Sequence, residues 1–226
     1  MKTIVLSLGG SLIIPEQYDL SFLKNFRGLV LRLASKGYRF VIFTGGGKLA
    51  RNFQEALKNY KKDASMRSLD WVGIYATRIN AHVVRRMFGE NAEKEIITNP
   101  TKKIRAKKKV IIAAGWKPGW STDYDSVLVA KQLKAKKVIN VTNVDYAYDK
   151  DPKKYKDAKK IRNILWKDFR KITGSKWNPG LNMPFDPIAS KMAEKLKMEV
   201  FLVGKNLKNL ENAIIGKKFN GTVIRS

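Results

Sequence analysis

The residues best placed to do chemistry in this sequence are glycines that follow short apolar runs. Gly9-Gly10-Ser11 follows one such run, and Gly45-Gly46-Gly47 follows another. Glycine lets the backbone turn with positive φ and lets a ligand approach without meeting a Cβ atom. A helical pattern begins after Gly47, so its first free N–H groups point back at the turn. Such a turn suits an anion, above all a phosphate.

A third turn follows the apolar run 110–114 and is richer in polar groups. Its sequence is Gly115-Trp116-Lys117-Pro118-Gly119-Trp120, and Ser121, Thr122 and Asp123 come next. Serine, threonine and aspartate are preferred N-cap residues, so we expect a helix to start here. Hydroxyls and free N–H groups at a helix start suit a phosphate or a carboxylate.

A fourth polar end follows the run 137–141, where Thr142 and Asn143 supply side-chain oxygens in place of glycine. One glycine turn alone is as well explained by a tight connection as by a ligand. Four polar or glycine-rich ends in one sheet instead predict a common ligand, because ligands of open α/β sheets bind beyond the carboxyl ends of the strands. The chemistry that these ends share favours phosphates.

These ends must be positioned by alternating strands and helices. Apolar runs predict strands at 3–8, 38–43, 94–98, 110–114, 137–141, 199–203 and 221–224. Helical spacing predicts helices from 21 to Gly37, from Gly47, over 66–87, after Ser121, over 166–172, from an Asp186 N-cap with Pro187 as first residue, and over 207–215. This alternation predicts an α/β fold, a three-layer αβα sandwich with a mainly parallel central sheet.

The chain is expected to form a single domain over residues 1–226. Its 226 residues include 44% hydrophobic ones, which is ordinary for a globular core, and no repeat or linker separates folded halves. The region 153–182 is expected to be loop apart from its short helix, and 174–184, with Trp177 and Asn178, is expected to be mobile. No apolar run is long enough to span a bilayer, so we expect a cytoplasmic protein without membrane contact.

Cysteine and histidine usage limits the possible chemistry. The absence of cysteine excludes disulfides, thiolate zinc sites and cysteine nucleophiles, and the single histidine, His82, cannot build a metal cluster alone. Any metal would be a hard cation held by oxygens and phosphates.

The net charge of +27, from 46 Lys and Arg against 19 Asp and Glu, is the one abnormal number of the composition. Such a field attracts polyanions. The lysines are spread along the whole chain, however, so a solvated basic surface is favoured over a binding role, and nucleic acid is expected only as a non-specific electrostatic partner. An RNA-binding protein would place aromatic residues among basic ones on one face, and the sequence reveals no such element.

Seven short motifs occur in order along nearly the whole chain: LGGS, TGGGKLAR, DWVGIYATR, GWKPGWSTD, TNVD, YDKDP and DPIASK. Together they resemble the amino acid kinase superfamily, and most closely its archaeal-type UMP kinases. The resemblance implies transfer of the γ-phosphoryl group of ATP to UMP, giving UDP and ADP in pyrimidine nucleotide biosynthesis. It also implies Mg²⁺ bound with ATP and a homohexamer of dimers that pack through the long helices. No protein side chain is assigned as a metal ligand.

The resemblance also assigns roles to residues. The residues implied in catalysis are Gly10, Ser11 and Lys191. Those implied in ATP binding are Gly9, Gly10, Ser11, Gly47, Arg51, Thr142, Asn143, Tyr148 and Asp151. Those implied in UMP binding are Gly46, Asp70, Trp116, Lys117, Pro118, Gly119, Trp120, Ser121 and Thr122. The acceptor side is expected mainly in 1–135 and the ATP side mainly in 136–226.

Physical chemistry agrees with this reaction. Phosphoryl transfer is promoted by positioning, by hydrogen-bond donors and by cations, without a protein nucleophile. The phosphate of UMP is already ionised, so no general base is required, which fits the absence of an obvious catalytic histidine.

Two positions depart from the pattern of the superfamily. Ser7 stands where many members have a lysine, and Tyr146 begins a turn that usually starts with glycine. The tyrosine either reshapes the adenine pocket or adopts a left-handed conformation at some cost. Both departures favour an alternative, a non-catalytic nucleotide-binding regulator on the same fold. A kinase of the same superfamily with another phosphate or carboxylate acceptor is a further alternative.

Overall fold

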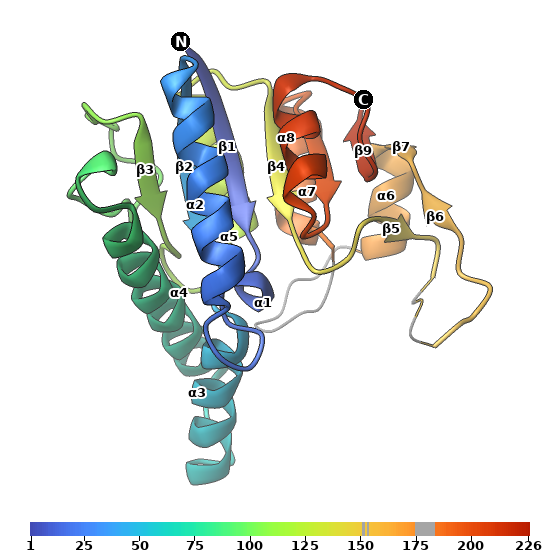
Figure 1. Ribbon diagram of the computed structural model, residues 1–226. Helices are drawn as coiled ribbons and strands as arrows, with labels where there is room; N and C mark the ends of the chain where they lie inside the picture. Colours follow the sequence, from blue (N-terminus) through green and yellow to red (C-terminus); the bar gives the residue numbers. More distant parts are fainter. Residues whose placement is uncertain (151, 153, 175–183) are drawn as a thin grey trace.

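A computed structural model describes residues 1–150, 152, 154–174 and 184–226. Its central sheet has seven strands in the order β3-β2-β1-β4-β8-β9-β7 (Figure 1). The first five strands of this order are parallel to one another, β9 is antiparallel to β8, and β7 is parallel to β9. A separate antiparallel pair is formed by β5 and β6. The mainly parallel sheet predicted from the sequence is therefore confirmed.

The elements follow one another in a largely alternating order. The strands are β1 (Lys2–Leu8), β2 (Tyr38–Thr44), β3 (Val110–Ala113), β4 (Lys137–Val141), β5 (Ala147–Tyr148), β6 (Lys160–Ile161), β7 (Asn163–Leu165), β8 (Glu199–Val203) and β9 (Thr222–Arg225). The helices are α1 (Gly10–Ile13), α2 (Leu20–Ser35), α3 (Gly47–Tyr60), α4 (Met66–Phe88), the 3-10 turn η1 (Gly89–Asn91), α5 (Thr122–Gln132), α6 (Trp166–Thr173), α7 (Pro187–Lys195) and α8 (Leu207–Ile215).

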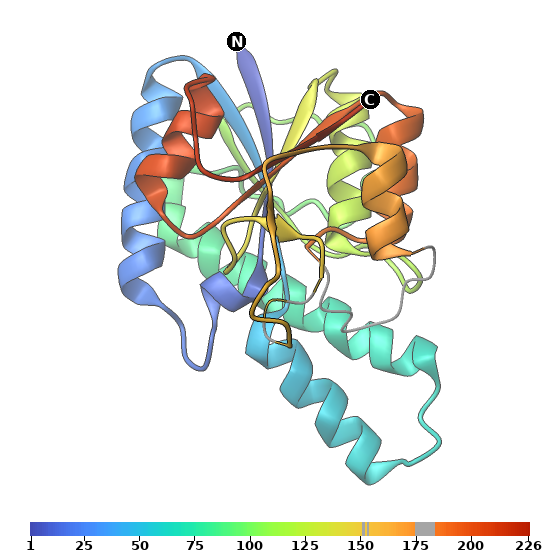
Figure 2. The same ribbon diagram turned by 90° about the vertical axis from the view of Figure 1, so that its right-hand side faces the viewer.

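Helices cover both faces of the sheet. One core joins the strands to α2, α4 and α8, and the other joins them to α5, α6 and α7, so that Figure 2 shows three layers. In β1, Leu6 and Leu8 enter the first core and Val5 enters the second, as the alternation of side chains along a strand requires. A sheet covered on both faces explains the continuous apolar runs. The predicted αβα sandwich is confirmed.

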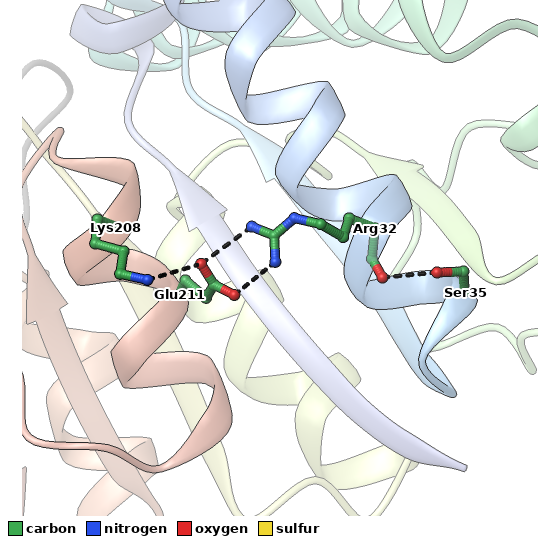
Figure 3. A network of polar contacts seen from close by, with 4 residues as sticks. All are labelled: Arg32, Ser35, Lys208 and Glu211. Carbon is green, nitrogen blue, oxygen red and sulfur yellow. Dashed lines mark hydrogen bonds and ion pairs between the residues drawn. The ribbon is translucent and has the colours of Figure 1, made fainter.

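An ion pair connects two helices of the first face. The guanidinium of Arg32 in α2 donates two hydrogen bonds, of 2.6 and 3.0 Å, to the carboxylate of Glu211 in α8 (Figure 3). Lys208 lies 4.0 Å from the same carboxylate, and the hydrogen bonds from Arg32 are the main cause that lowers the pKa of Glu211. The pair is partly exposed, so its contribution to stability is small.

The prediction of a strand over residues 94–98 is wrong. Only isolated bridges form there, from Ala92 to Val110 and from Ile97 to Ala113. Three charged residues at 93–95 separate the two bridging positions, and continuous pairing beside β3 does not form.

The region 153–182 contains the predicted helix as α6, and it also contains β6 and β7, which the sequence did not predict. Each has two or three residues, too few to show a periodicity. The residues expected to be mobile, including Trp177 and Asn178, lie mostly outside the described residues.

Tyr146 does not adopt the left-handed conformation considered from the sequence. Within the described residues, the non-glycine residues at positive φ are Lys134 and Lys197. The ring of Tyr146 is buried, and its hydroxyl donates to Asn220 Oδ1 at 3.2 Å. No helix in the described part of the chain combines the length and the apolar character that a membrane crossing requires.

Candidate active site

The carboxyl ends of β1, β2, β3 and β4 border one cleft of about 610 Å³. All four polar ends predicted from the sequence contribute to its lining, as the parallel arrangement of these strands requires. The predicted site residues that line the cleft are Gly9, Gly10, Ser11, Gly46, Gly47, Arg51, Asp70, Trp120, Ser121, Thr122, Thr142 and Asn143.

The remaining predicted site residues are not part of this lining. They are Trp116, Lys117, Pro118 and Gly119, which lie in the loop leading to Trp120, Tyr148 in β5, and Lys191, which is exposed on α7. Asp151 lies outside the described residues. The roles of these residues stay predictions from the resemblance.

The two glycine turns touch each other through their backbones. A Cβ atom on Gly10 would lie 2.0 Å from the nitrogen of Gly47, and one on Gly45 would lie 2.4 Å from the nitrogen of Gly10. The N–H of Gly45 also donates to the carbonyl of Leu8 at 2.9 Å. Only glycine permits this approach, so the starts of α1 and α3 lie side by side at the cleft.

Helix α4 holds the ends of β2 and β3. The buried amide of Asn80 donates to the carbonyls of Gly45 and Gly46 at 2.8 and 3.1 Å. The hydroxyl of Thr77 accepts the N–H of Gly115 at 2.9 Å. The sequence analysis missed Asn80 as a support of the triple glycine, because its contact spans 35 residues of sequence and no local pattern marks it.

Asp70, at the start of α4, faces the third turn. Its carboxylate accepts the N–H of Gly119 at 2.6 Å. Burial raises the pKa of Asp70, and the hydrogen bond from Gly119 opposes that rise. The carboxylate predicted to hold the sugar of UMP thus lies in the cleft and also contacts the loop that precedes Trp120.

A pair of carboxylates lies at the starts of α5 and α7. Asp123 accepts the hydroxyl of Ser7 at 2.8 Å and the N–H of Asp186 at 3.3 Å, and Asp186 accepts the hydroxyl of Ser121. Burial and then the charge of Asp186 raise the pKa of Asp123 to about 7, and burial raises that of Asp186. The sequence analysis interpreted both aspartates as N-cap residues only; Asp186 does cap α7, with Pro187 in the first turn as predicted.

Comparison with known proteins identifies the family of this arrangement. Residues 2–204 match the model described as the amino acid kinase family. This chain belongs to the amino acid kinase family. The match covers every strand end that borders the cleft.

Curated relatives of this amino acid kinase family member are named uridylate kinase, among them proteins from two archaea. The protein from Thermoplasma volcanium is 33% identical over 96% of this chain and 94% of its own length. The protein from Methanobrevibacter smithii is 34% identical, with 98% of both chains covered. A solved structure, the uridylate kinase from Archaeoglobus fulgidus, has a TM-score of 0.82 and 30% identity, covering 99% of this chain and 100% of that one.

The groups that line the cleft of this amino acid kinase family member determine what it can do. They include the glycines of the turns, hydroxyls, carboxylates, the carboxamides of Gln54, Asn140 and Asn143, and the guanidinium of Arg51. The one histidine, His82, is not part of the lining, and the chain has no cysteine. Such a set suits transfer of a charged group between bound phosphates, a reaction that requires no protein nucleophile.

Proposed function

We propose that this protein is a UMP kinase, which transfers the γ-phosphoryl group of ATP to the phosphate of UMP and releases UDP and ADP. The observation that carries the proposal is the contact between two glycine turns at a single cleft that also holds Asp70 and Trp120. Relatives named uridylate kinase, matched over nearly their full length, support UMP as the acceptor.

In this proposal the donor and the acceptor occupy opposite sides of the cleft. ATP phosphates would contact 9–11, Gly47 and Arg51, and its adenosine would lie near Thr142, Asn143, Tyr148 and Asp151. The phosphate of UMP would contact Gly46, its sugar Asp70, and its remaining surface the loop 116–122. The acceptor side would thus come mainly from 1–135 and the adenosine side from 136–226.

The contact between the turns supplies the positioning that the reaction needs. Two phosphates bound at Gly10 and at Gly46 would meet end to end, which replaces an encounter in solution by a fixed geometry. Backbone N–H groups of the turns, the hydroxyl of Ser11 and the ammonium of Lys191 would stabilise the charge that develops on the transferred group. The ionised phosphate of UMP would attack directly, so no proton has to be removed.

The carboxylates of the cleft indicate how magnesium would be bound. The described residues contain no group of three or more His, Cys, Asp or Glu side chains arranged to hold a metal ion. Asp123 and Asp186 line the cleft, but both accept hydrogen bonds from the protein. This set fits Mg²⁺ that would arrive with ATP and be held mainly by phosphate oxygens and water, with Asp123 and Asp186 as the residues that would hold it on the protein side. The ion would neutralise phosphate charge.

Exposed apolar side chains on the helical hairpin α3–α4 support the proposed assembly of a homohexamer through the long helices. Met66, Tyr75 and Ile79 of α4 are 52%, 53% and 43% exposed, and Tyr60 at the end of α3 is 91% exposed. A second copy packed on this hairpin would cover them. We propose a cytoplasmic location for the enzyme, where both nucleotides are available.

A coupled assay with ATP, Mg²⁺ and each nucleoside monophosphate tests the function. We expect UDP from UMP, and we expect Asp70→Ala to raise KM for UMP and Arg51→Ala to raise KM for ATP, each by about tenfold or more for a lost contact to a charged ligand. Arg67→Ala, an exposed residue at the start of α4, is the matched control. Nucleotide binding without any turnover would instead indicate a non-catalytic regulator. Ser7, which lies beside Asp123, is the feature that supports this alternative.

A further inference from the structure

The loop between β3 and α5, residues 114–121, forms one wall of the cleft through Gly115, Trp120 and Ser121. We name it the acceptor loop, because the proposed function places UMP against it. A loop of eight residues has many conformations, and the acceptor can be bound well only if one of them is favoured in advance.

Arg78 of α4 contacts the backbone of this loop at two successive carbonyls. Its Nε donates to the carbonyl of Gly115 at 3.2 Å, and its Nη2 donates to that of Trp116 at 2.7 Å. A planar guanidinium presents its N–H groups in a fixed fork, so it can hold two neighbouring acceptors at once, and the ammonium of lysine cannot. Arg78 is half-buried and is not part of the cleft lining, and its Nε and Nη2 donate to backbone carbonyls of the loop.

Two aromatic rings of the same helix hold the guanidinium in place. Its Cζ lies 5.9 Å from the centre of the Trp71 ring and 5.6 Å from that of Tyr75, and the two rings stack on each other at 5.7 Å. The positions 71, 75 and 78 share one face of α4, because helical residues three and four apart are neighbours. The side chain therefore has a defined orientation before any ligand binds.

Two carboxylates, Asp125 of α5 and Asp70 of α4, also hold the loop. The N–H of Trp116 donates to Oδ2 of the buried Asp125 at 3.0 Å, and the N–H of Gly119 donates to Asp70 at 2.6 Å. The residue Trp116 is thus fixed through both its carbonyl, by Arg78, and its N–H, by Asp125. Trp120 and Ser121 follow within five residues, so their positions depend on these contacts.

We propose that Arg78 is a positioning residue for the acceptor: its guanidinium holds Gly115 and Trp116 in the backbone conformation that places Trp120 and Ser121 against UMP. The inference rests on the proposed function for the identity of the acceptor. It assigns Arg78 no contact with the reacting atoms.

The variant Arg78→Lys tests the proposal, because it keeps the charge and removes the fork. We expect KM for UMP to rise by about tenfold to hundredfold, since the loss of a hydrogen bond from a charged donor has effects of that size. KM for ATP should change by less than about twofold, because the donor turns do not contact Arg78. Arg86→Lys, an exposed arginine on the same helix, is the matched control and should change neither constant.

Hydrogen exchange of backbone amides gives a second readout that does not depend on catalysis. Exchange in the acceptor loop should accelerate by about tenfold or more in Arg78→Lys and stay unchanged in the turns at Gly10 and Gly47, because only the loop loses hydrogen bonds. If Arg78→Lys does not fold, Trp71→Leu removes the supporting ring that lies outside the proposed subunit contact and should give a smaller rise in KM for UMP alone.

Equal increases of both KM values, or an unchanged KM for UMP with unchanged exchange in the loop, would overturn the proposal. If the wild-type protein forms no UDP, the proposed function fails, and exchange in the loop then decides separately whether Arg78 fixes it.

Discussion

The clearest test of the energetics of this site is Asp125→Asn. Asp125 is fully buried, its Oδ2 accepts one hydrogen bond from Trp116, and its Oδ1 has no partner within the described part of the chain. Burial is the main cause that raises the pKa of Asp125 from 3.8 to about 8, and the charges of Asp186, Asp123 and Asp70 add to the rise. The folded protein therefore holds a proton on Asp125 at pH values where the unfolded chain has lost it.

The sign and size of the effect follow from these two pKa values. A group whose pKa is raised on folding favours the folded state at low pH, and that advantage is lost as the pH rises from the unfolded pKa through the folded one. With about 1.4 kcal/mol per pKa unit, wild type should lose on the order of 4 kcal/mol of unfolding free energy at most between pH 5 and pH 8 from this group. The asparagine side chain of the variant resembles the neutral acid and does not titrate, so the variant should lack this loss.

Urea unfolding followed by circular dichroism at pH 5, 6, 7 and 8, at one protein concentration, measures the difference between variant and wild type. Groups that do not interact with Asp125 are common to both proteins and cancel in that difference. We expect the unfolding free energy of Asp125→Asn relative to wild type to rise steadily with pH. Asp63→Asn, at an exposed position, is the control and should stay level. A difference for Asp125→Asn that varies by less than about 0.5 kcal/mol over this range, as for ordinary surface changes, would refute the reasoning.

Gly10→Ala should lower the unfolding free energy by about 3 kcal/mol or more, because the new Cβ would overlap the nitrogen of Gly47 and the turns would have to separate. Gly28→Ala, in the middle of α2 with open space around its Cβ position, should raise the unfolding free energy by about 0.5–1 kcal/mol. Similar changes for Gly10→Ala and Gly28→Ala in thermal unfolding would contradict the backbone contact. Lys134→Gly should raise the unfolding free energy by up to about 1 kcal/mol, because φ of +54° strains a residue with a Cβ atom. Lys136→Gly, two positions away, should lower the unfolding free energy in the same urea titration. A lower unfolding free energy in both variants would show that Lys134 is not strained.

The sequence predicted the elements whose signals are local. Strands β1, β2, β4 and β8 are continuous apolar runs because both faces of the sheet are covered, and the Asp186-Pro187 helix start is visible in two residues. Strands β6 and β7 could not be predicted in the same way. They are held by partners distant in the chain, as when Asn163, Ile164 and Leu165 pair with β9 some 60 positions later.

The same distinction between local signals and contacts distant in the chain applies to the residues of the candidate site. The glycine turns could be predicted, because a backbone that must approach a ligand or another backbone leaves glycine in the sequence. Asn80, Asn140 and the Asp123–Asp186 pair could not, since each acts through a contact that spans 35 to 63 residues. The sequence neighbours of an asparagine in a helix or a strand do not indicate whether its side chain makes such a contact. Only the folded chain shows that Asn140 donates to the carbonyl of Pro184.

The contact between Gly10 and Gly47 has a consequence for how this enzyme could be given new substrates. Where two main chains meet directly, no exchange of side chains can narrow the gap between them, and even the smallest addition, Gly10→Ala, would force the turns apart, so the spacing of donor and acceptor is closed to gradual change. The opposite wall is held by the side chains of Asp70, Arg78 and Asp125, each of which can be replaced one step at a time. Libraries that seek kinases for other monophosphates should therefore diversify 116–120 and its three supports, and leave the glycines untouched.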